Sequence, residues 1–545
     1  MKRLRVTGAL STAVIGIGHL ITGAPAQAGG TLTVGMTAGD LPVTTGNPDQ
    51  GFEGYRFVGY NLHDALVLWD LSGSGEKAPD IKPGLATGWQ IDEANDKRWI
   101  FTLRQGVKWH DGCPFTADDV VWNFGYSGDE KAPHFNPAQF AQARAYLGTY
   151  AGVEKVDDHT VAFTTKVPDA LFPYMMSFVM MVSPCRAKEV KYNWTEYALH
   201  PSGTGPYKFD KMVAHQRLEF VPNTEYWDKA RVPKQDRLVL VPMPEASTRT
   251  AALLSGQVDW IEAPSPDALD RLKSAGMQIV TRVYPHNWSY QLNFVKGPFT
   301  DKRVRQAANY ALNREDMKEL LNGMMLEGYA TVPPSLPFYG HPVLYKYDPA
   351  KAKALLQEAG CMPCTVHFAI STSGSGQMQP LPMNELVKSQ LDAAGFDVKL
   401  ETMDWNALIA VAREGTEKYP QYDAINVSRG SQDPFNALIR HVWTGSWSPR
   451  GANWGHYKNP DVEKLVADIL KEFDTAKRPA MLTKLHELMS EDAVMIFVAH
   501  DVNPRALSPK VHGFVQAQSW FQDLTPVKTR PSQIRNCIGS GLSKP

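Results

Sequence analysis

Two cysteines three residues apart, Cys361 and Cys364, are the pair whose spacing most directly suggests chemistry. A Cys-x-x-Cys pair can form a redox site, half of a zinc site or a tight local disulfide. No second Cys-x-x-Cys motif and no histidine pair completes a zinc site. In an oxidising compartment we favour a structural disulfide between them. Cys113, Cys185 and Cys537 remain unassigned.

Other short motifs that hold a nucleophile, a metal ion or a nucleotide phosphate are missing. The sequence has no G-x-S-x-G, no H-E-x-x-H, no P-loop and no complete G-x-G-x-x-G. Its 15 histidines are scattered singly, which does not favour a metal site. We therefore predict no catalytic residue, no metal and no cofactor, and the remaining chemistry is recognition of a solute.

Aromatic residues could supply much of that recognition, since the chain has 14 tryptophans and 20 tyrosines. Flat apolar side chains suit a cleft that holds a solute between two faces while a few polar groups fix its orientation. Most aromatic residues belong to a core, so we favour those in predicted loops or at strand ends. These candidates for ligand contact are Tyr55, Trp288, Trp405, Trp443, Trp447 and Trp454.

The polar loop at residues 428–434 supplies further candidates for ligand contact. Ser428, Arg429, Gln432 and Asp433 can donate or accept hydrogen bonds, and two of them carry opposite charges. For Arg429 and Asp433 the ordinary alternative is a surface or helix-capping role.

The N-terminus has the layout of a cleavable export signal. Three basic residues among the first five precede a modest apolar run at residues 14–21, and Ala26 and Ala28 fit a cleavage site. We predict a signal peptide at residues 1–28, with a short amphipathic helix as the alternative. The run is too short to anchor in a bilayer, and no cysteine follows to accept a lipid. We therefore expect a periplasmic protein.

The composition of the chain limits the classes of partner that it could bind. The chain has 56 basic and 57 acidic residues, and this balance leaves no electrostatic footprint for nucleic acid or for an anionic membrane surface. With 43% hydrophobic residues it can bury an ample core, and its length suggests two or more domains.

The elements that position these residues are clearest at residues 98–124. Trp99, Phe101 and Leu103 alternate with polar residues, which predicts a half-buried strand. A turn follows, and Thr116 is a good N-cap for a helix that begins with two aspartates. The stretch predicts a strand, a turn and a helix.

The amino-acid sequence from Leu103 to Val120 closely resembles the signature segment of the family 5 extracellular solute-binding proteins. These are the dipeptide-, oligopeptide- and nickel-binding proteins of ABC importers. Further resemblance lies in the GTGPY sequence at residues 203–207, at residues 299–307 and at residues 348–360. In all, it extends over residues 30–509.

The resemblance implies an α/β, two-lobed fold of the periplasmic-binding-protein type II, of the large three-subdomain kind, with a ligand cleft between the lobes. It places lobe I at residues 29–290, with a small extra subdomain at about 76–200, and lobe II at 291–494. Residues 495–545 would return to lobe I. The chain would cross between lobes near residues 287–294 and 494–497.

The implied function is that of the periplasmic substrate-binding component of an ABC transporter, which is not an enzyme. It would capture a peptide or a peptide-like small organic solute and deliver it to permease subunits in the inner membrane, and we expect a monomer. One alternative is a periplasmic hydrolase of peptides or sugars, which would need a nucleophile and base, or paired carboxylates, in the cleft. Another is a chaperone or sensor without a permease.

Two positions of the family pattern argue against an ordinary dipeptide as ligand. Peptide binders of this family pair the peptide ammonium with an Asp, and that position is Gly430 here. The Arg that dipeptide binders use for the peptide carboxylate would fall near Gly374. Because an unpaired buried charge costs several kcal/mol, the resemblance predicts weak dipeptide binding. Arg429 or Asp433 could serve instead.

Overall fold

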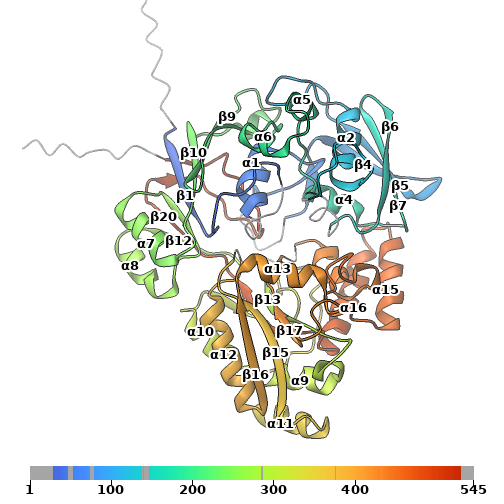
Figure 1. Ribbon diagram of the computed structural model, residues 1–545, viewed down its shortest axis with the longest axis vertical. Helices are drawn as coiled ribbons and strands as arrows, with labels where there is room; N and C mark the ends of the chain where they lie inside the picture. The colour runs from blue at the N-terminus through green and yellow to red at the C-terminus, as the bar shows by residue number, and fades with distance from the viewer. Residues whose placement is uncertain are drawn as a thin grey trace, which may run out of the picture.

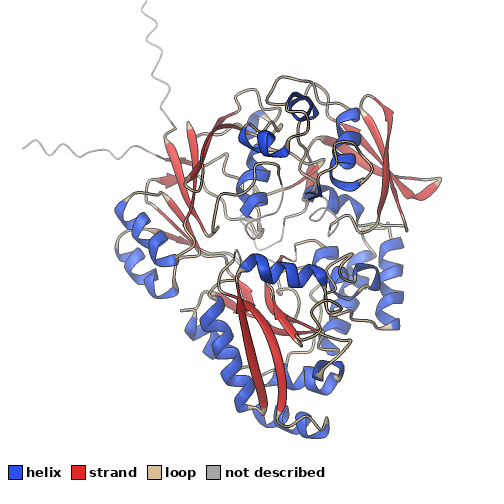
Figure 2. Cartoon of the chain, viewed as in Figure 1, coloured by secondary structure: helices blue, strands red, loops and turns tan. Residues whose placement is uncertain are grey.

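The computed structural model describes residues 29–46, 53–73, 79–137, 139, 146–283, 286–374, 376–430 and 432–529. Its chain forms two large mixed sheets, one in each half of the molecule (Figures 1 and 2). The predicted signal peptide lies outside the described residues. Among the described residues, none of the helices combines the length and apolarity needed to cross a membrane.

The first sheet defines the first lobe and has β1 near its centre, parallel to both of its neighbours. In spatial order its strands are β12 (Gln278–Val280), β20 (Arg505–Leu507), β11 (Trp260–Glu262), β1 (Thr31–Met36), β10 (Arg237–Pro242), β9 (Arg217–Pro222) and β8 (Tyr207–Val213). Beside it lie α7 (Ala246–Ser255) and α8 (Leu269–Ser274). Helix α7 ends where Gly256 takes a left-handed φ of 76°.

The second sheet defines the second lobe. Its strands in order are β14 (Met325–Glu327), β19 (Met495–Asp501), β13 (His286–Leu292), β17 (Ala424–Asn426), β15 (Cys364–Ser371) and β16 (Phe396–Met403), with β18 (Arg429–Gly430) paired to β13. The helices of this lobe are α9 (Lys302–Tyr310), α10 (Arg314–Leu320), α11 (Pro349–Glu358), α12 (Pro380–Ala393), α13 (Trp405–Glu414), α15 (Pro460–Lys471) and α16 (Arg478–Glu491). Aspartate side chains cap α9, α11 and α13.

A third, antiparallel sheet forms a small subdomain within the range predicted for one. Its order is β4 (Ala86–Asp92), β5 (Asn95–Leu103), β7 (Thr160–Thr165) and β6 (Tyr150–Asp157), and α2 (Ala117–Gly128) packs on it. The predicted strand, turn and helix are confirmed. Along β5, Trp99, Phe101 and Leu103 are buried, and Thr116 forms a capping box with Asp119 at the start of α2.

The predicted crossover strands both belong to the second lobe, which corrects the predicted lobe boundaries. Strands β13 and β19 pair with each other in the second sheet, so the chain crosses before His286 and after Asp501. Lobe II was predicted to begin at residue 291 and to end at 494. Every residue of both strands is buried. A uniformly buried strand carries no alternation, so its sequence does not reveal which sheet it joins.

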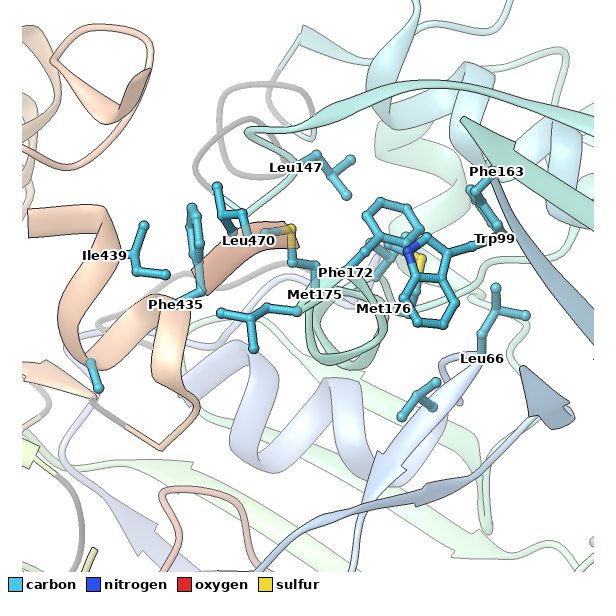
Figure 3. Close-up of a cluster of buried hydrophobic side chains, with 14 of the residues drawn as sticks. Leu66, Trp99, Leu147, Phe163, Phe172, Met175, Met176, Phe435, Ile439 and Leu470 are labelled. Atoms are coloured by element: carbon cyan, nitrogen blue, oxygen red, sulfur yellow. The ribbon is translucent and has the colours of Figure 1, made fainter. Parts of the chain in front are cut away.

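Apolar packing joins the small subdomain to the second lobe. Figure 3 shows Trp99, Phe172 and Met175 of the subdomain in one cluster with Phe435 and Leu470 of the second lobe. The backbone N–H of Ala170 also donates to the carbonyl of Leu470 at 2.8 Å. The two lobes are therefore in contact along this side of the cleft.

Two disulfides brace the described chain. Cys361 and Cys364 are bonded at the start of β15, which confirms the predicted local disulfide. Cys113 and Cys185 form a second bond, 72 residues apart in sequence, that the sequence left unassigned. Both lie in the small-subdomain region, where the bond ties the turn before α2 to the start of α5 (Pro184–Glu189). Cys537 lies outside the described residues.

Candidate functional site

A cavity lies between the lobes, with walls from both. It contains about 660 Å³ of space free of protein atoms. From the small subdomain and the first lobe come four aromatic residues, Tyr146, Phe178, Trp520 and Phe521. The second lobe contributes an apolar patch of Trp405, Ile409 and Val427, together with His286, Ser428, Arg429, Gly430, Gln432, Asp433, Asn436 and Arg440. This first cavity thus combines an aromatic wall with a polar wall.

The polar wall is built by the loop after β18 and the helical turns that follow it, η6 (Phe435–Ile439) and α14 (Arg440–Val442). Asp433 is buried, and its carboxylate accepts the backbone N–H of Asn436 at 3.0 Å and its Nδ2 at 2.6 Å. The Asn436 Oδ1 in turn accepts a hydrogen bond from Arg440 Nη1. Asp433 therefore takes a capping role while it also faces the cavity.

Two guanidinium groups, those of Arg429 and Arg440, face this cavity without a carboxylate in ion-pair contact. Within the described part of the chain, neither takes part in an ion pair. Arg440 is buried and its Cζ lies 5.6 Å from the ring centroid of Tyr146. Arg429 is half-buried. With the Gln291 amide turned so that its oxygen faces Arg429, that oxygen accepts from Nε at 2.9 Å and from Nη2 at 3.2 Å.

The electrostatics of the polar wall reflect this excess of positive charge. Burial, followed by the positive charge of Arg440, lowers the pKa of Arg429 to about 9. The guanidinium is therefore still charged at neutral pH. Burial also raises the pKa of Asp433 above its usual range, against the hydrogen bonds from Asn436. Burial and then the charge of Arg56 are the main causes that lower the pKa of His286 to about 3, so its imidazole is neutral.

Three buried polar atoms on this wall have no hydrogen-bond partner among the described residues. They are Ser428 Oγ, Gln432 Nε2 and Arg440 Nε. Leaving such an atom unsatisfied costs about 1–3 kcal/mol. The rest of the loop is well fixed, because Ser428 N donates to Gln377 Oε1 at 2.7 Å and Ser519 Oγ donates to Gln432 Oε1 at 2.7 Å. The second of these bonds links the two lobes across the cleft.

A second cavity of about 1,010 Å³ adjoins the first, and Trp520 lines both. Its lining includes Arg56 and Glu262 from the first lobe and Gly374 from the second. Here the buried charges are paired. Arg56 contacts Glu262 at 2.6 Å, and Arg505 contacts the same carboxylate at 3.1 Å.

Half of the predicted contact residues line the first cavity. Trp405, Ser428, Arg429, Gln432 and Asp433 do so directly. Tyr55 lies one layer behind, where its ring contacts those of Tyr146, Phe178 and Phe521, with centroids 6.2 Å apart in each case.

The other four predicted tryptophans have no place in the first cavity. Trp288 and Trp454 are fully buried in the core of the second lobe, where their indole N–H groups donate to Gln377 O and Val411 O. Trp447 stacks on His456 at 4.8 Å. Trp443 packs against Phe435 and lines a separate hollow beside Tyr150. A tryptophan at a strand end or in a loop can pack into the core as well as line the cleft. Its position in the sequence therefore does not distinguish a core residue from a cavity residue.

Sequence reasoning missed Arg440 and the four aromatic residues of the opposite wall. Arg440 lies six residues beyond the end of the predicted loop, on a helical turn whose residues are otherwise buried in the core. A buried arginine in an apolar segment is the only sequence signal that could have found it. Trp520 and Phe521 lie beyond residue 509, where the resemblance ends.

The two glycines singled out by the family pattern differ in their surroundings. A Cβ at Gly430 would meet nothing within 4 Å, so this position is open to the cavity. At Gly374 a Cβ would lie 2.5 Å from Trp405 Cε3, and the φ of 132° is unfavourable for other residues. The indole of Trp405 therefore covers the backbone where the family's arginine would stand.

Two lobes, joined by the chain before His286 and after Asp501, and a cavity between them define a solute-binding protein of the two-lobed type. The sequence model of the bacterial extracellular solute-binding proteins, family 5 middle, matches residues 80–460. The chain belongs to this family.

The comparisons with individual proteins agree. Heme-binding protein A of Haemophilus influenzae is 30% identical over 477 residues, which cover 84% of this chain and 86% of that protein. The dipeptide-binding protein of Escherichia coli is 27% identical over 80% of this chain and 84% of its own. Among solved structures, the periplasmic binding protein DppA from Helicobacter pylori, in complex with the peptide STSA, has a TM-score of 0.81 at 24% identity. The superposed region covers 93% of this chain and 99% of the Helicobacter pylori protein.

Proposed function

We propose that this chain is the periplasmic solute-receiving subunit of a bacterial ABC importer and that its first cavity holds a peptide or a peptide-like small organic solute. The observation that carries the proposal is the two-sided lining of the cavity, with Trp405 on one lobe and Trp520 and Phe521 on the other. Several relatives bind peptides or other small solutes by name, which supports the same class of ligand.

Capture would follow from closure of the two lobes. Only the closed form lets a solute contact both walls at once, so a solute that does so binds that form more tightly and shifts the population toward it. The bond between Ser519 and Gln432 across the cleft would help to hold such a closed form. The closed complex would then dock on permease subunits in the inner membrane, after export directed by the signal peptide.

A hydrolase finds little support in the cavity walls. Asp433 is the one carboxylate among the described residues of the first cavity, and Asn436 already occupies both of its oxygens. The hydroxyl of Ser428 has no hydrogen-bond partner among the described residues, so none of these acts on it as a base. No feature of the described residues favours a chaperone or sensor over a transport protein.

Native mass spectrometry tests the proposal directly. Protein purified from the periplasm of its host is expected to carry a small molecule that appears as an added mass and is released on denaturation. The released solute, added back to stripped protein, should bind in calorimetry and change the small-angle scattering profile. A scattering profile that stays the same with every bound solute would count against capture by lobe closure.

A further inference from the structure

The polar wall of the first cavity holds more positive than negative charge. Arg429 and Arg440 contribute two guanidinium groups, while Asp433 contributes the one described carboxylate. Even with Asp433 ionised, one positive charge is left over. A buried charge without a counter-ion is costly, so the cavity as it stands is electrostatically incomplete.

From this geometry we infer that the solute presents a single carboxylate to Arg429 and Arg440, and that it needs no free ammonium group. The inference rests on the proposed function, because it assumes that a solute occupies the first cavity. It goes further in naming the charge of that solute and the two residues that select it. The apolar body of the solute would lie between Trp405 and the aromatic wall of Trp520 and Phe521.

The hydrogen-bonding groups fit a carboxylate. Arg440 Nε is buried and has no acceptor among the described residues, and Ser428 Oγ and Gln432 Nε2 on the same wall also lack partners there. All three atoms can donate, whereas a carboxylate only accepts. Guanidinium groups bind carboxylates with strong, charge-assisted hydrogen bonds.

The number of charges favours one carboxylate over a dianion such as a phosphate monoester. One carboxylate neutralises the single positive charge that remains after Asp433 is counted. A second negative charge would be repelled by the buried Asp433 carboxylate on the same wall.

An ammonium group finds no carboxylate free of hydrogen bonds among the described residues of this wall. The residue that would face it is Gly430, whose α-carbon opens on empty space. Asp433 is the nearby carboxylate, but both of its oxygens already accept hydrogen bonds from Asn436. A cationic solute would also meet the two arginines. The wall therefore selects against the ammonium end of a peptide, which peptide binders of this family recognise at this position.

Four matched probes isolate charge from shape: N-acetyl-alanyl-phenylalanine, its neutral amide, alanyl-phenylalanine and its cationic amide. Binding is measured by calorimetry on protein stripped of any carried solute. The N-acetylated acid is expected to bind about 30-fold more tightly than its neutral amide, because the amide leaves the charged groups unpaired. The cationic amide should bind most weakly of the four.

Variants then assign the selectivity to residues. In Arg440→Met the ratio between the N-acetylated acid and its amide should fall to about one, because the remaining charge is balanced by Asp433. The side chain in Gly430→Asp should fit, since the position is open. This variant should bind the N-acetylated acid more weakly and the cationic amide more tightly than the unmodified protein does. Gly430→Asn adds a side chain of the same size without charge, so the difference between these two variants reports charge alone.

The outcomes separate this inference from the proposed function. Selectivity for the acid that disappears in Arg440→Met supports the inference. Equal or tighter binding of the cationic amide by the unmodified protein overturns it and leaves the proposed function intact, because a solute has still bound. Failure of all four probes to bind at millimolar concentration counts against the proposed peptide-like ligand itself, and the inference fails with it.

Discussion

The two walls of the cleft each hold a pair of buried or half-buried arginines, and the two pairs differ in their counter-ions. On the first lobe, Arg56 and Arg505 share the carboxylate of Glu262. On the second lobe, Arg429 and Arg440 face the first cavity with no ion pair among the described residues. All four arginines carry the same charge, and the fold determines which of them contact a carboxylate.

This difference distinguishes a structural ion network from a binding site. Burial alone would raise the pKa of Glu262, but the charges of Arg56 and Arg505 hold it below its ordinary value. The protein therefore completes that network itself. At Arg429 the charge that acts most strongly is that of another arginine, Arg440, which leaves the completing group to come from outside.

The largest effect is expected where the completed network is broken. Glu262→Gln should lower the free energy of unfolding by about 3–5 kcal/mol, because it removes the buried carboxylate that Arg56 and Arg505 share and leaves Arg56 with Glu53 alone. Urea denaturation of the solute-free protein measures the change. Glu245→Gln is the matched control, since Glu245 is exposed at the edge of the second cavity and takes part in no ion pair among the described residues. If both variants unfold alike, the contrast between the pairs is not real.

The reverse result is expected for the unpaired arginines. Arg440→Met should weaken binding of the carried solute by about 30-fold or more. Its solute-free form should keep its unfolding free energy to within about 1 kcal/mol, because the change removes a buried charge that lacks a counter-ion. Arg505→Met provides the comparison, as it should destabilise the fold instead. A large loss of stability in Arg440→Met would show that this arginine is structural.

A smaller effect is expected from the aromatic side of the same cavity. Trp405→Ala should weaken solute binding by roughly tenfold, since one stacking face is lost while the polar anchor stays. Calorimetry with the carried solute measures the change. Trp447→Ala, which removes a half-buried indole from the same lobe but outside the cavity, should leave the affinity unchanged. Equal affinities for both variants would remove Trp405 from the site.

Local features of the fold were predictable, while its long-range pairings were not. The strand and helix at residues 98–124 follow from alternation and from the Thr116 cap, which act within a few residues. The sheet that holds β13 and β19 could not be inferred, because buried strands look alike in either lobe. The loop at residues 428–434 was found because the family resemblance places a ligand-binding Asp in it, at the position of Gly430. Trp520 lines the same cavity as that loop only because the two lobes face each other, which no local pattern records.

The smallest effect concerns His286, on which one arginine of each pair acts. Burial, and then the charges of Arg56, His500 and Arg429, lower its pKa to about 3. Since the unfolded-state pKa is near 6.5, the unfolded chain binds more protons than the folded one between these values. The stability that depends on neutral His286 is therefore present above pH 6.5 and is lost as the pH falls toward 3.

The measurement is urea denaturation of the solute-free protein and of His286→Gln at several pH values. From pH 7 to pH 6 the unmodified protein should lose roughly 0.7 kcal/mol more than the variant does. At pH 8 the difference between the two should no longer change with pH, which serves as the internal control. Equal slopes between pH 7 and pH 6 would mean that His286 takes up its proton in the folded protein. Burial and the positive charge of Arg56 would then act on His286 more weakly than the geometry indicates.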